Sequence, residues 1–343
     1  MPSCCSECFH DIEIVEFIVK DHLNGRCGHC KKENAFTINP EALSHFFEPF
    51  LGLVTEKEDG RLLSEVLNNL FNIFSSKVKS NCRLLSEILG GGYGQKKYEL
   101  KQDFQEHISA WETFKEELKH QNRFFPKNTL YSSLFDTREA NIDGDLFQII
   151  EQLRVEYDEG EVFYRARIND GPLLKVDMGM PPKEKATAGR ANPVGIPYLY
   201  LADHEKTCVA EVRPNNTSTI YIANFTSNKK LSIVDLTEPR KRFSVCSFDE
   251  GRFTTIIGII KLLETLSNEL SKPVRPESSS IDYIPTQFLC EFLKGFSNCD
   301  GIAFESSFGK GKNFVFFDDA GFDIEDPVPH KIISIEHNFL PKQ

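Results

Sequence analysis

The stretch GRANPVGIPYLYLADHEKTCVAEVRP, residues 189–214, indicates a loop, a short strand and a helix in immediate succession. Glycine and proline bound the loop, PYLYLA reads as a strand, and Asp203 is placed to cap the following helix. Four polar residues lie within this small unit: Arg190, Asn192, Tyr200 and Glu211. We therefore expect a cleft where an anion anchor, an aromatic ring and a carboxylate meet.

Short strands become frequent around this unit from about residue 161 onward. The predicted strands are EVFYRARI, PYLYLA, STIYIANF, LSIVDL, DGIAFESS and NFVFFDD, with helices at about 204–213, 253–268 and 285–295. This mixture predicts an α+β domain of short, mostly antiparallel strands. The sequence has neither a strand–GxGxxG–helix pattern nor a P-loop, so a Rossmann or Walker nucleotide site is not supported.

Residues 1–36 are defined by two Cys-x-x-Cys pairs, CSEC and CGHC, separated by 18 residues. This is the spacing of a four-thiolate zinc ribbon, in which each pair supplies two sulfur ligands. We expect a structural zinc site made by Cys5, Cys8, Cys27 and Cys30. Cys4 in place of Cys5, and His29 as a further ligand, are alternatives that the sequence leaves open.

The segment from 37 to 150 is predicted to be a helical domain. Apolar residues recur at helical spacing over 62–74 and 104–118, and Asn39 before Pro40 is typical of a helix start. GGGYG, at 90–94, is expected to link two helices and not to cradle a phosphate. Residues 123–143 read as a linker, and 145–160 read as a short helix that leads into the second half.

Composition narrows the class of protein. The chain has 343 residues, 40% apolar and 27% charged, with a formal net charge of -11, which argues against general attraction to nucleic acid or anionic membranes. No apolar run is long enough for a membrane helix, and the first residues lack a signal-peptide pattern. With ten cysteines and no such signal, we expect a reducing, cytoplasmic location where clustered thiols bind metal.

Each polar residue of the second half has an ordinary structural explanation when it is taken alone. A strand arginine is usually a solvated edge residue, and a tyrosine at a strand end usually packs in the core. Considered together, Arg165, Arg190, Tyr200, Glu211 and Ser306 supply an anion anchor, a ring, a carboxylate and a hydroxyl. That combination suits a dinucleotide held across a bond to be broken.

Four motifs in order resemble the RES domain family: FYRAR, GRANPVGIPYLYLADHEKTCVAEV, YIPTQFLCEF and DGIAFESSFGKGKNFVFF. The resemblance covers residues 163 to about 318, within a domain expected over 151–343, and implies an ADP-ribosyltransferase-like fold that consumes NAD+. The region ahead of it resembles HEPN/RES N-terminal domains more loosely. It lacks the Arg–His ribonuclease pair of HEPN proteins, since neither His107 nor His120 follows an arginine at the required spacing.

The resemblance implies that four residues form the catalytic set: Arg165, Tyr200, Glu211 and Ser306. Substrate-binding support is expected from Arg167, Arg190, Asn192, Ser307 and Asn313. Two ambiguities remain, because Arg167 competes with Arg165 in FYRARI and Ser307 competes with Ser306 in ESS.

The function implied is cleavage of the nicotinamide–ribose bond of NAD+ by hydrolysis or phosphorolysis, in a toxin or defence effector. ADP-ribosyl transfer to a macromolecule, and a non-catalytic protein that binds through its zinc ribbon, are the alternatives. An enzyme that consumes NAD+ needs restraint, so we expect an inhibitor or antitoxin protein, or a trigger. The family also implies a dimer, and nucleic acid is expected only at the ribbon.

Overall fold

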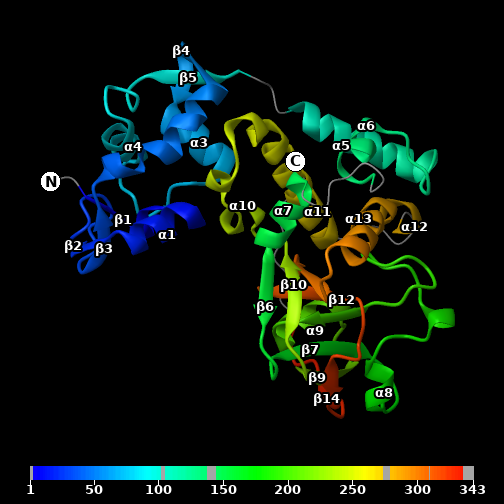
Figure 1. Cartoon of the computed structure of the whole chain (residues 1–343). Coiled ribbons are helices and arrows are strands. Elements are labelled where there is room, and N and C mark those ends of the chain that lie inside the picture. The colour runs from blue at the N-terminus through cyan, green and yellow to red at the C-terminus, as the bar shows by residue number, and fades with distance from the viewer. Residues whose placement is uncertain (1–2, 102–104, 137–143, 273–278, 309, 335–343) are drawn as a thin grey trace. The chain divides into compact units, whose positions relative to one another are not determined.

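The structure is a computed structural model that describes residues 3–101, 105–136, 144–272, 279–308 and 310–334 (Figure 1). The chain divides into two compact units, each assembled from separate segments. The first comprises Met1–Trp111, Asp143–Gln152 and Glu238–Leu262; the second comprises Glu112–Ile142, Leu153–Thr237 and Leu263–Gln343. The three segments expected from the sequence, 1–36, 37–150 and 151–343, stay predictions.

The first unit combines short helices with a three-stranded sheet of order β1–β3–β2 and an antiparallel pair, β4 with β5. Its strands are β1 (Cys4–Cys5), β2 (Leu23–Gly25), β3 (Ala35–Ile38), β4 (Val54–Leu62) and β5 (Lys97–Leu100). Its helices are α1 (Ile12–Lys20), α2 (Ser44–Phe47), α3 (Leu63–Phe71), α4 (Asn81–Leu89), α7 (Asp145–Gln152) and α10 (Pro239–Arg242). The division between the units falls within α5 (Gln105–His120) and α11 (Phe253–Ser271).

The helical prediction for residues 37–150 is right for α3 to α5 and wrong for β4 and β5. Glu and Lys in β4 favour helix by propensity, but the ladder to β5 overrides that preference around a bulge opposite the buried Tyr98. Gly60 permits this approach, because a Cβ there would lie 2.5 Å from the Tyr98 carbonyl oxygen. The glycine cluster 90–94 therefore connects a helix to a strand and not two helices.

Other local predictions have mixed outcomes. Asn39 does cap the turn that begins at Pro40, since its side chain accepts a hydrogen bond from the Glu41 amide. The segment 123–143 contains a short helix, α6 (Thr129–Leu134), and its residues 137–143 lie outside the described part of the chain. Asp203 is not a cap: α9 begins at Glu205 after His204, whose side chain makes no capping bond.

The second unit is built on a nine-stranded sheet within the described residues, of order β13–β9–β7–β8–β12–β11–β10–β6, with β14 also paired to β9 (Figure 1). Only the β10–β11 pair is parallel among the pairs described for this sheet, which confirms the mostly antiparallel α+β class. Its predicted strands are present as β7 (Val162–Ile168), β8 (Leu199–Ala202), β9 (Thr219–Ser227), β10 (Leu231–Asp235), β11 (Gly301–Glu305) and β12 (Lys312–Phe316). The strands not foreseen are β6 (Arg154–Tyr157), β13 (Phe322–Ile324) and β14 (Val328–Lys331). The helix predicted over 145–160 therefore ends at Gln152, because the residues after it pair with β10 as β6.

The two faces of this sheet bury different side chains. One face carries a phenylalanine cluster in which Phe163 meets Phe314 edge-to-face with ring centroids 4.9 Å apart. On the other face α9 (Glu205–Val212) packs Cys208, Val209 and Val212 against Ala166 and Ala202. The remaining helices that lie wholly in the unit are α6, α8 (Lys175–Met178), α12 (Ser279–Asp282) and α13 (Ile284–Phe296). The polar site lies where α9 covers the sheet.

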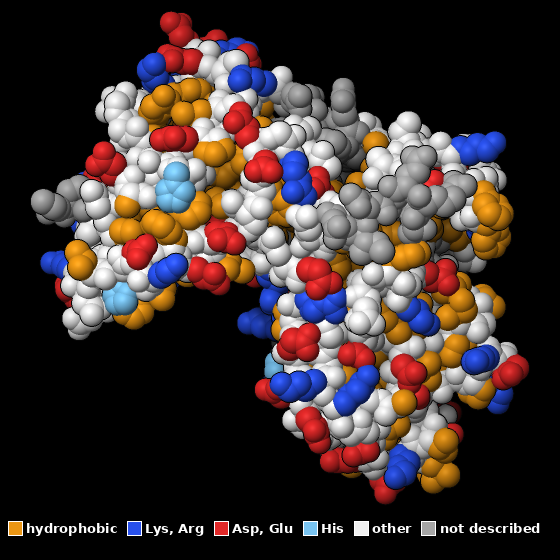
Figure 2. Space-filling model, in the orientation of Figure 1, with side chains coloured by type: hydrophobic (Ala, Val, Ile, Leu, Met, Phe, Trp, Pro, Cys, Tyr) orange, Lys and Arg blue, Asp and Glu red, His pale blue; other side chains and the backbone are white. Residues whose placement is uncertain are grey.

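The surface shows no single-sign charge field on the face drawn in Figure 2, where acidic and basic side chains are interspersed. Among the helices that the structure describes, none combines the length and apolar character needed to cross a bilayer.

Candidate active site

Glu211, in the last turn of α9, is held by two donors from neighbouring strand ends. The Ser306 hydroxyl, just after β11, donates to Glu211 Oε1 at 2.7 Å, and the Asn313 amide of β12 donates to the same oxygen at 2.7 Å. β11 and β12 pair antiparallel, which places these two residues close together. The carboxylate is thereby fixed in direction while its second oxygen has neither of these contacts.

Tyr200, on β8, is held from the other side by the loop 189–192. Its hydroxyl donates to Asn192 Oδ1 at 2.8 Å and accepts from the Ala191 amide at 3.2 Å. Burial raises the pKa of Tyr200, so the phenol stays protonated at neutral pH. The Asn192 amide nitrogen donates to carbonyl groups of its own loop, so this residue organises the loop that presents the ring.

Arg190 projects from this loop to the C-terminal end of α11. Its guanidinium donates to the carbonyl oxygens of Leu270 at 2.7 Å and Ser271 at 3.1 Å, an end of a helix that favours cations. Ser307 also donates to the Ser271 carbonyl, whereas its neighbour Ser306 faces Glu211. The geometry therefore distinguishes the two serines that the sequence left equivalent.

Arg165 and Arg167 lie on one face of β7, as their spacing predicts. Both guanidinium groups donate to the Gly179 carbonyl oxygen, at 3.1 Å and 3.2 Å. Burial, and then the positive charge of Arg167, lower the pKa of Arg165 to about 9, so it remains a cation at neutral pH. Burial also lowers the pKa of Arg167, and its Nε is buried without a hydrogen-bond partner in the structure.

A cavity of about 400 Å³ joins most of these groups. It is lined by predicted residues from five segments, Arg165, Arg190, Tyr200, Glu211 and Asn313. A second cavity of about 630 Å³ shares Arg165 and Tyr200 and adds Arg167 and Asn192. Neither Ser306 nor Ser307 lines the two cavities, but Ser306 donates a hydrogen bond to Glu211, which lines the first. The arrangement can place cations, a ring and a carboxylate around one elongated anionic ligand.

Sequence reasoning missed four residues of this site. Tyr164 and Tyr283 line the first cavity, while Thr286 and Gln287 of α13 bind the 189–192 loop from behind. The sequence feature that could have indicated Thr286 and Gln287 is YIPTQFLCEF, in which these two adjacent polar residues interrupt an otherwise apolar helix. Buried polar residues of that kind need partners, and here the partners are loop carbonyls.

The four predicted metal ligands of the first unit converge on one point. The sulfur atoms of Cys5, Cys8, Cys27 and Cys30 all lie within 4.8 Å of one another. Neighbouring sulfurs are 3.8 Å apart for Cys5–Cys8, 3.4 Å for Cys5–Cys30 and 3.5 Å for Cys8–Cys27. A tetrahedral site with zinc–sulfur bonds of about 2.3 Å requires sulfurs about 3.8 Å apart. The cluster therefore fits a zinc ion held by four thiolates.

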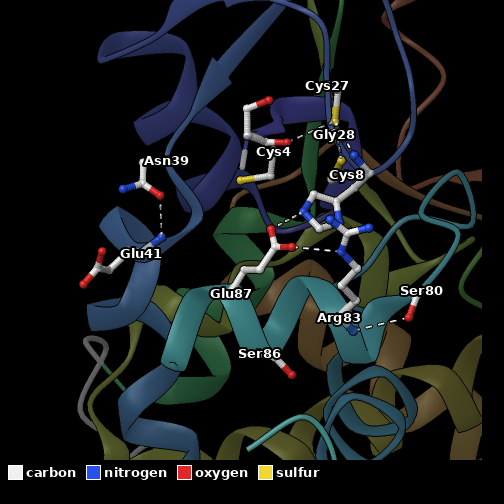
Figure 3. A network of polar contacts seen from close by, with 12 residues as sticks. Cys4, Cys8, Cys27, Gly28, Asn39, Glu41, Ser80, Arg83, Ser86 and Glu87 are labelled. Atoms are coloured by element: carbon white, nitrogen blue, oxygen red, sulfur yellow. Dashed lines mark hydrogen bonds and ion pairs between the residues drawn. The ribbon is translucent and has the colours of Figure 1, made fainter. Parts of the chain in front are cut away.

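Cys4 and His29, the alternative ligands, have other partners. The Cys4 thiol points to the Ile38 carbonyl oxygen at 3.8 Å, and His29 Nε2 lies 2.9 Å from a Glu87 carboxylate oxygen. Glu87, on α4, also receives Arg83 Nε at 2.9 Å, and Figure 3 shows the two side chains beside the cysteine ribbon. His29 therefore ties the ribbon to α4, and the sulfur cluster contains Cys5 and not Cys4.

Comparison with known proteins identifies the family to which the second half of the chain is similar. The model of the RES domain family matches residues 162–336. No curated protein matched the sequence. Among solved structures, the Mycobacterium tuberculosis MbcT-MbcA toxin-antitoxin complex is similar at 16% identity, over 56% of this chain and 94% of that chain, with a TM-score of 0.33.

Proposed function

The chain belongs to the RES domain family, and from this membership we propose that it cleaves the nicotinamide–ribose bond of NAD+. Hydrolysis and phosphorolysis both fit the site, since water and phosphate are alternative acceptors for the same ribosyl carbon. The observation that carries the proposal is the Glu211 carboxylate, held by Ser306 and Asn313 in a cavity that also exposes Arg165, Arg190 and Tyr200.

The chemistry needs little acid catalysis. The nicotinamide of NAD+ is already cationic, so it departs as a neutral base and carries the bonding electrons with it. The ribose left behind develops oxocarbenium character, which a nearby carboxylate stabilises. Glu211 takes this role, and the acceptor then bonds to the ribosyl carbon and loses a proton.

The other residues bind and orient the substrate. Arg165 and Arg190 are the cations of the cavity, and a guanidinium fork suits the pyrophosphate. Arg167 adds positive charge in the adjoining cavity. Tyr200 shapes the nicotinamide pocket, and Ser306 and Asn313 keep the carboxylate aimed at the ribose.

The N-terminal cysteine ribbon holds a structural zinc ion in this proposal. Four thiolates close the coordination sphere, and three of the ligands, Cys5, Cys8 and Cys27, are fully buried. Zinc there stabilises the fold of the ribbon and leaves no position for substrate. We assign the helical segment that follows, with its loose HEPN resemblance, a regulatory role.

The biological role we propose is that of a toxin or defence effector in the cytoplasm. Uncontrolled consumption of NAD+ would harm the cell that makes the enzyme. An inhibitor or antitoxin protein, or a trigger, therefore belongs to the proposal, as does a homodimer.

The test is release of nicotinamide from NAD+ by the full-length protein, with and without phosphate, beside Glu211→Gln. Loss of the carboxylate should lower the rate by about 100- to 1,000-fold, as for removal of other charge-stabilising groups. Glu205→Gln, on the exposed first turn of the same helix, is the matched control and should keep the activity. Release that needs phosphate would identify a phosphorylase, and label from NAD+ appearing on protein or nucleic acid would favour the transferase instead.

A further inference from the structure

Two adjacent residues of α13 hold the loop that forms one wall of the cavity. The Gln287 side-chain amide donates to the carbonyl oxygens of Gly189 at 2.8 Å and Asn192 at 3.0 Å. The Thr286 hydroxyl donates to the Arg190 carbonyl oxygen at 2.6 Å. Only 8% of Gln287 is exposed, so water cannot easily replace these donors.

The same loop sets the position of the Tyr200 hydroxyl. Asn192 accepts from that hydroxyl and Ala191 donates to it, while the Gly189 amide donates to the Asn192 carbonyl oxygen at 2.9 Å. The loop lies very close to the ring: a Cβ at Gly189 would be 2.5 Å from Tyr200 Oη. A shift of the loop must therefore move the tyrosine, and it carries Arg190 with it.

The Glu211 side of the cavity has separate support. Its carboxylate is held by Ser306 and Asn313, neither of which contacts Gln287 or Thr286 through a hydrogen bond described in the structure. The cavity thus has a substrate-holding wall fixed by α13 and a carboxylate fixed by β11 and β12. Damage to one support should leave the other in place.

We propose that Gln287, assisted by Thr286, is a positioning residue that holds Tyr200 and Arg190 in the geometry that binds NAD+. The inference rests on the proposed function and deepens it by assigning the binding wall to α13. It predicts an effect on substrate affinity and not on the chemical step, because the Glu211 supports are untouched.

The experiment compares full-length wild type with Gln287→Met, which removes both donors at nearly constant volume. We expect KM for NAD+ to rise by about 10- to 100-fold, the cost of a small misplacement of binding groups. The value of kcat should stay within about threefold, the signature of lost uniform binding. Glu291→Gln, on an exposed position of the same helix, is the control and should change neither constant.

Thr286→Val keeps the inference testable if Gln287→Met folds poorly, because it removes only one hydroxyl at constant shape. It should raise KM in the same direction and by less. Unchanged KM in both variants, or a fall in kcat that matches the loss in kcat/KM, would overturn the inference.

A direct binding measurement separates this inference from the proposed function. Titration calorimetry with NAD+ on the Glu211→Gln background reports affinity without turnover. If wild type releases no nicotinamide but binds NAD+, weaker binding in Gln287→Met on that background still supports the role of α13. If NAD+ does not bind at all, both proposals fail.

Discussion

Replacing Ser306 with alanine tests whether this serine acts through Glu211. The hydroxyl donates to the carboxylate at 2.7 Å, and a hydrogen bond to a charged group contributes about 1.5–3 kcal/mol. At 1.36 kcal/mol for each factor of ten, its loss corresponds to roughly 10- to 150-fold in kcat/KM. Asn313 still donates to the same oxygen, so we expect the lower end, about tenfold.

The assay is the initial rate of nicotinamide release over a range of NAD+ concentrations. Ser307→Ala is the matched control, because that hydroxyl donates to the Ser271 carbonyl oxygen, and it should stay within about twofold of wild type. The double variant Ser306→Ala with Glu211→Gln should lose little beyond Glu211→Gln alone, since the serine then has no carboxylate to hold. Fully multiplicative losses, or equal effects of the two serine substitutions, would refute the reasoning.

Two further predictions concern stability. Cys27→Ser should abolish the binding of about one zinc ion per chain and lower the melting temperature, whereas Cys4→Ser should keep the metal. Zinc analysis of the purified variants tests this prediction, and the reverse pattern would contradict the ligand assignment. Although burial acts in the opposite direction, the ammonium of Lys312 at 2.8 Å holds the pKa of the fully buried Asp235 below its usual value. The stability from this pair is therefore complete above the pKa of an unfolded aspartate and is lost as pH falls through the lower folded pKa. Urea unfolding at pH 7 should show that Lys312→Met lowers the free energy of unfolding by about 3 kcal/mol. The control Lys310→Met, at an exposed position, should lower it little. Equal effects of the two substitutions would contradict the role assigned to the Lys312–Asp235 pair.

The burial of Arg165 bears on its proposed role in binding NAD+. Its guanidinium is partly removed from water and bonded to the Gly179 carbonyl oxygen, so it is already ordered before substrate arrives. In the proposed complex, an arginine held in this way would lose less conformational entropy on binding the pyrophosphate than a mobile one. The site thus combines prepositioned cations with a prepositioned carboxylate.

Local sequence was sufficient for features whose cause is local. The short runs of β-branched and aromatic residues in β7 to β12 predicted strands, because such side chains pack well on a pleated sheet. The Cys-x-x-Cys spacing predicted the ribbon, because two such pairs can supply the four ligands of one metal site. The motif order around Arg165, Tyr200, Glu211 and Ser306 was also enough to indicate the family and the candidate catalytic set.

Tertiary structure alone decided features that depend on residues distant in the chain. The β4–β5 pair overrides helix-favouring residues only once Tyr98 is placed opposite the bulge, and Ser306 differs from Ser307 only because β11 directs one hydroxyl to Glu211. The role of Gln287 was invisible in sequence, since its partners lie 95 or more positions away. Propensity and spacing act over a few residues, whereas a hydrogen bond of this kind exists only after the sheet and α13 have brought both partners together.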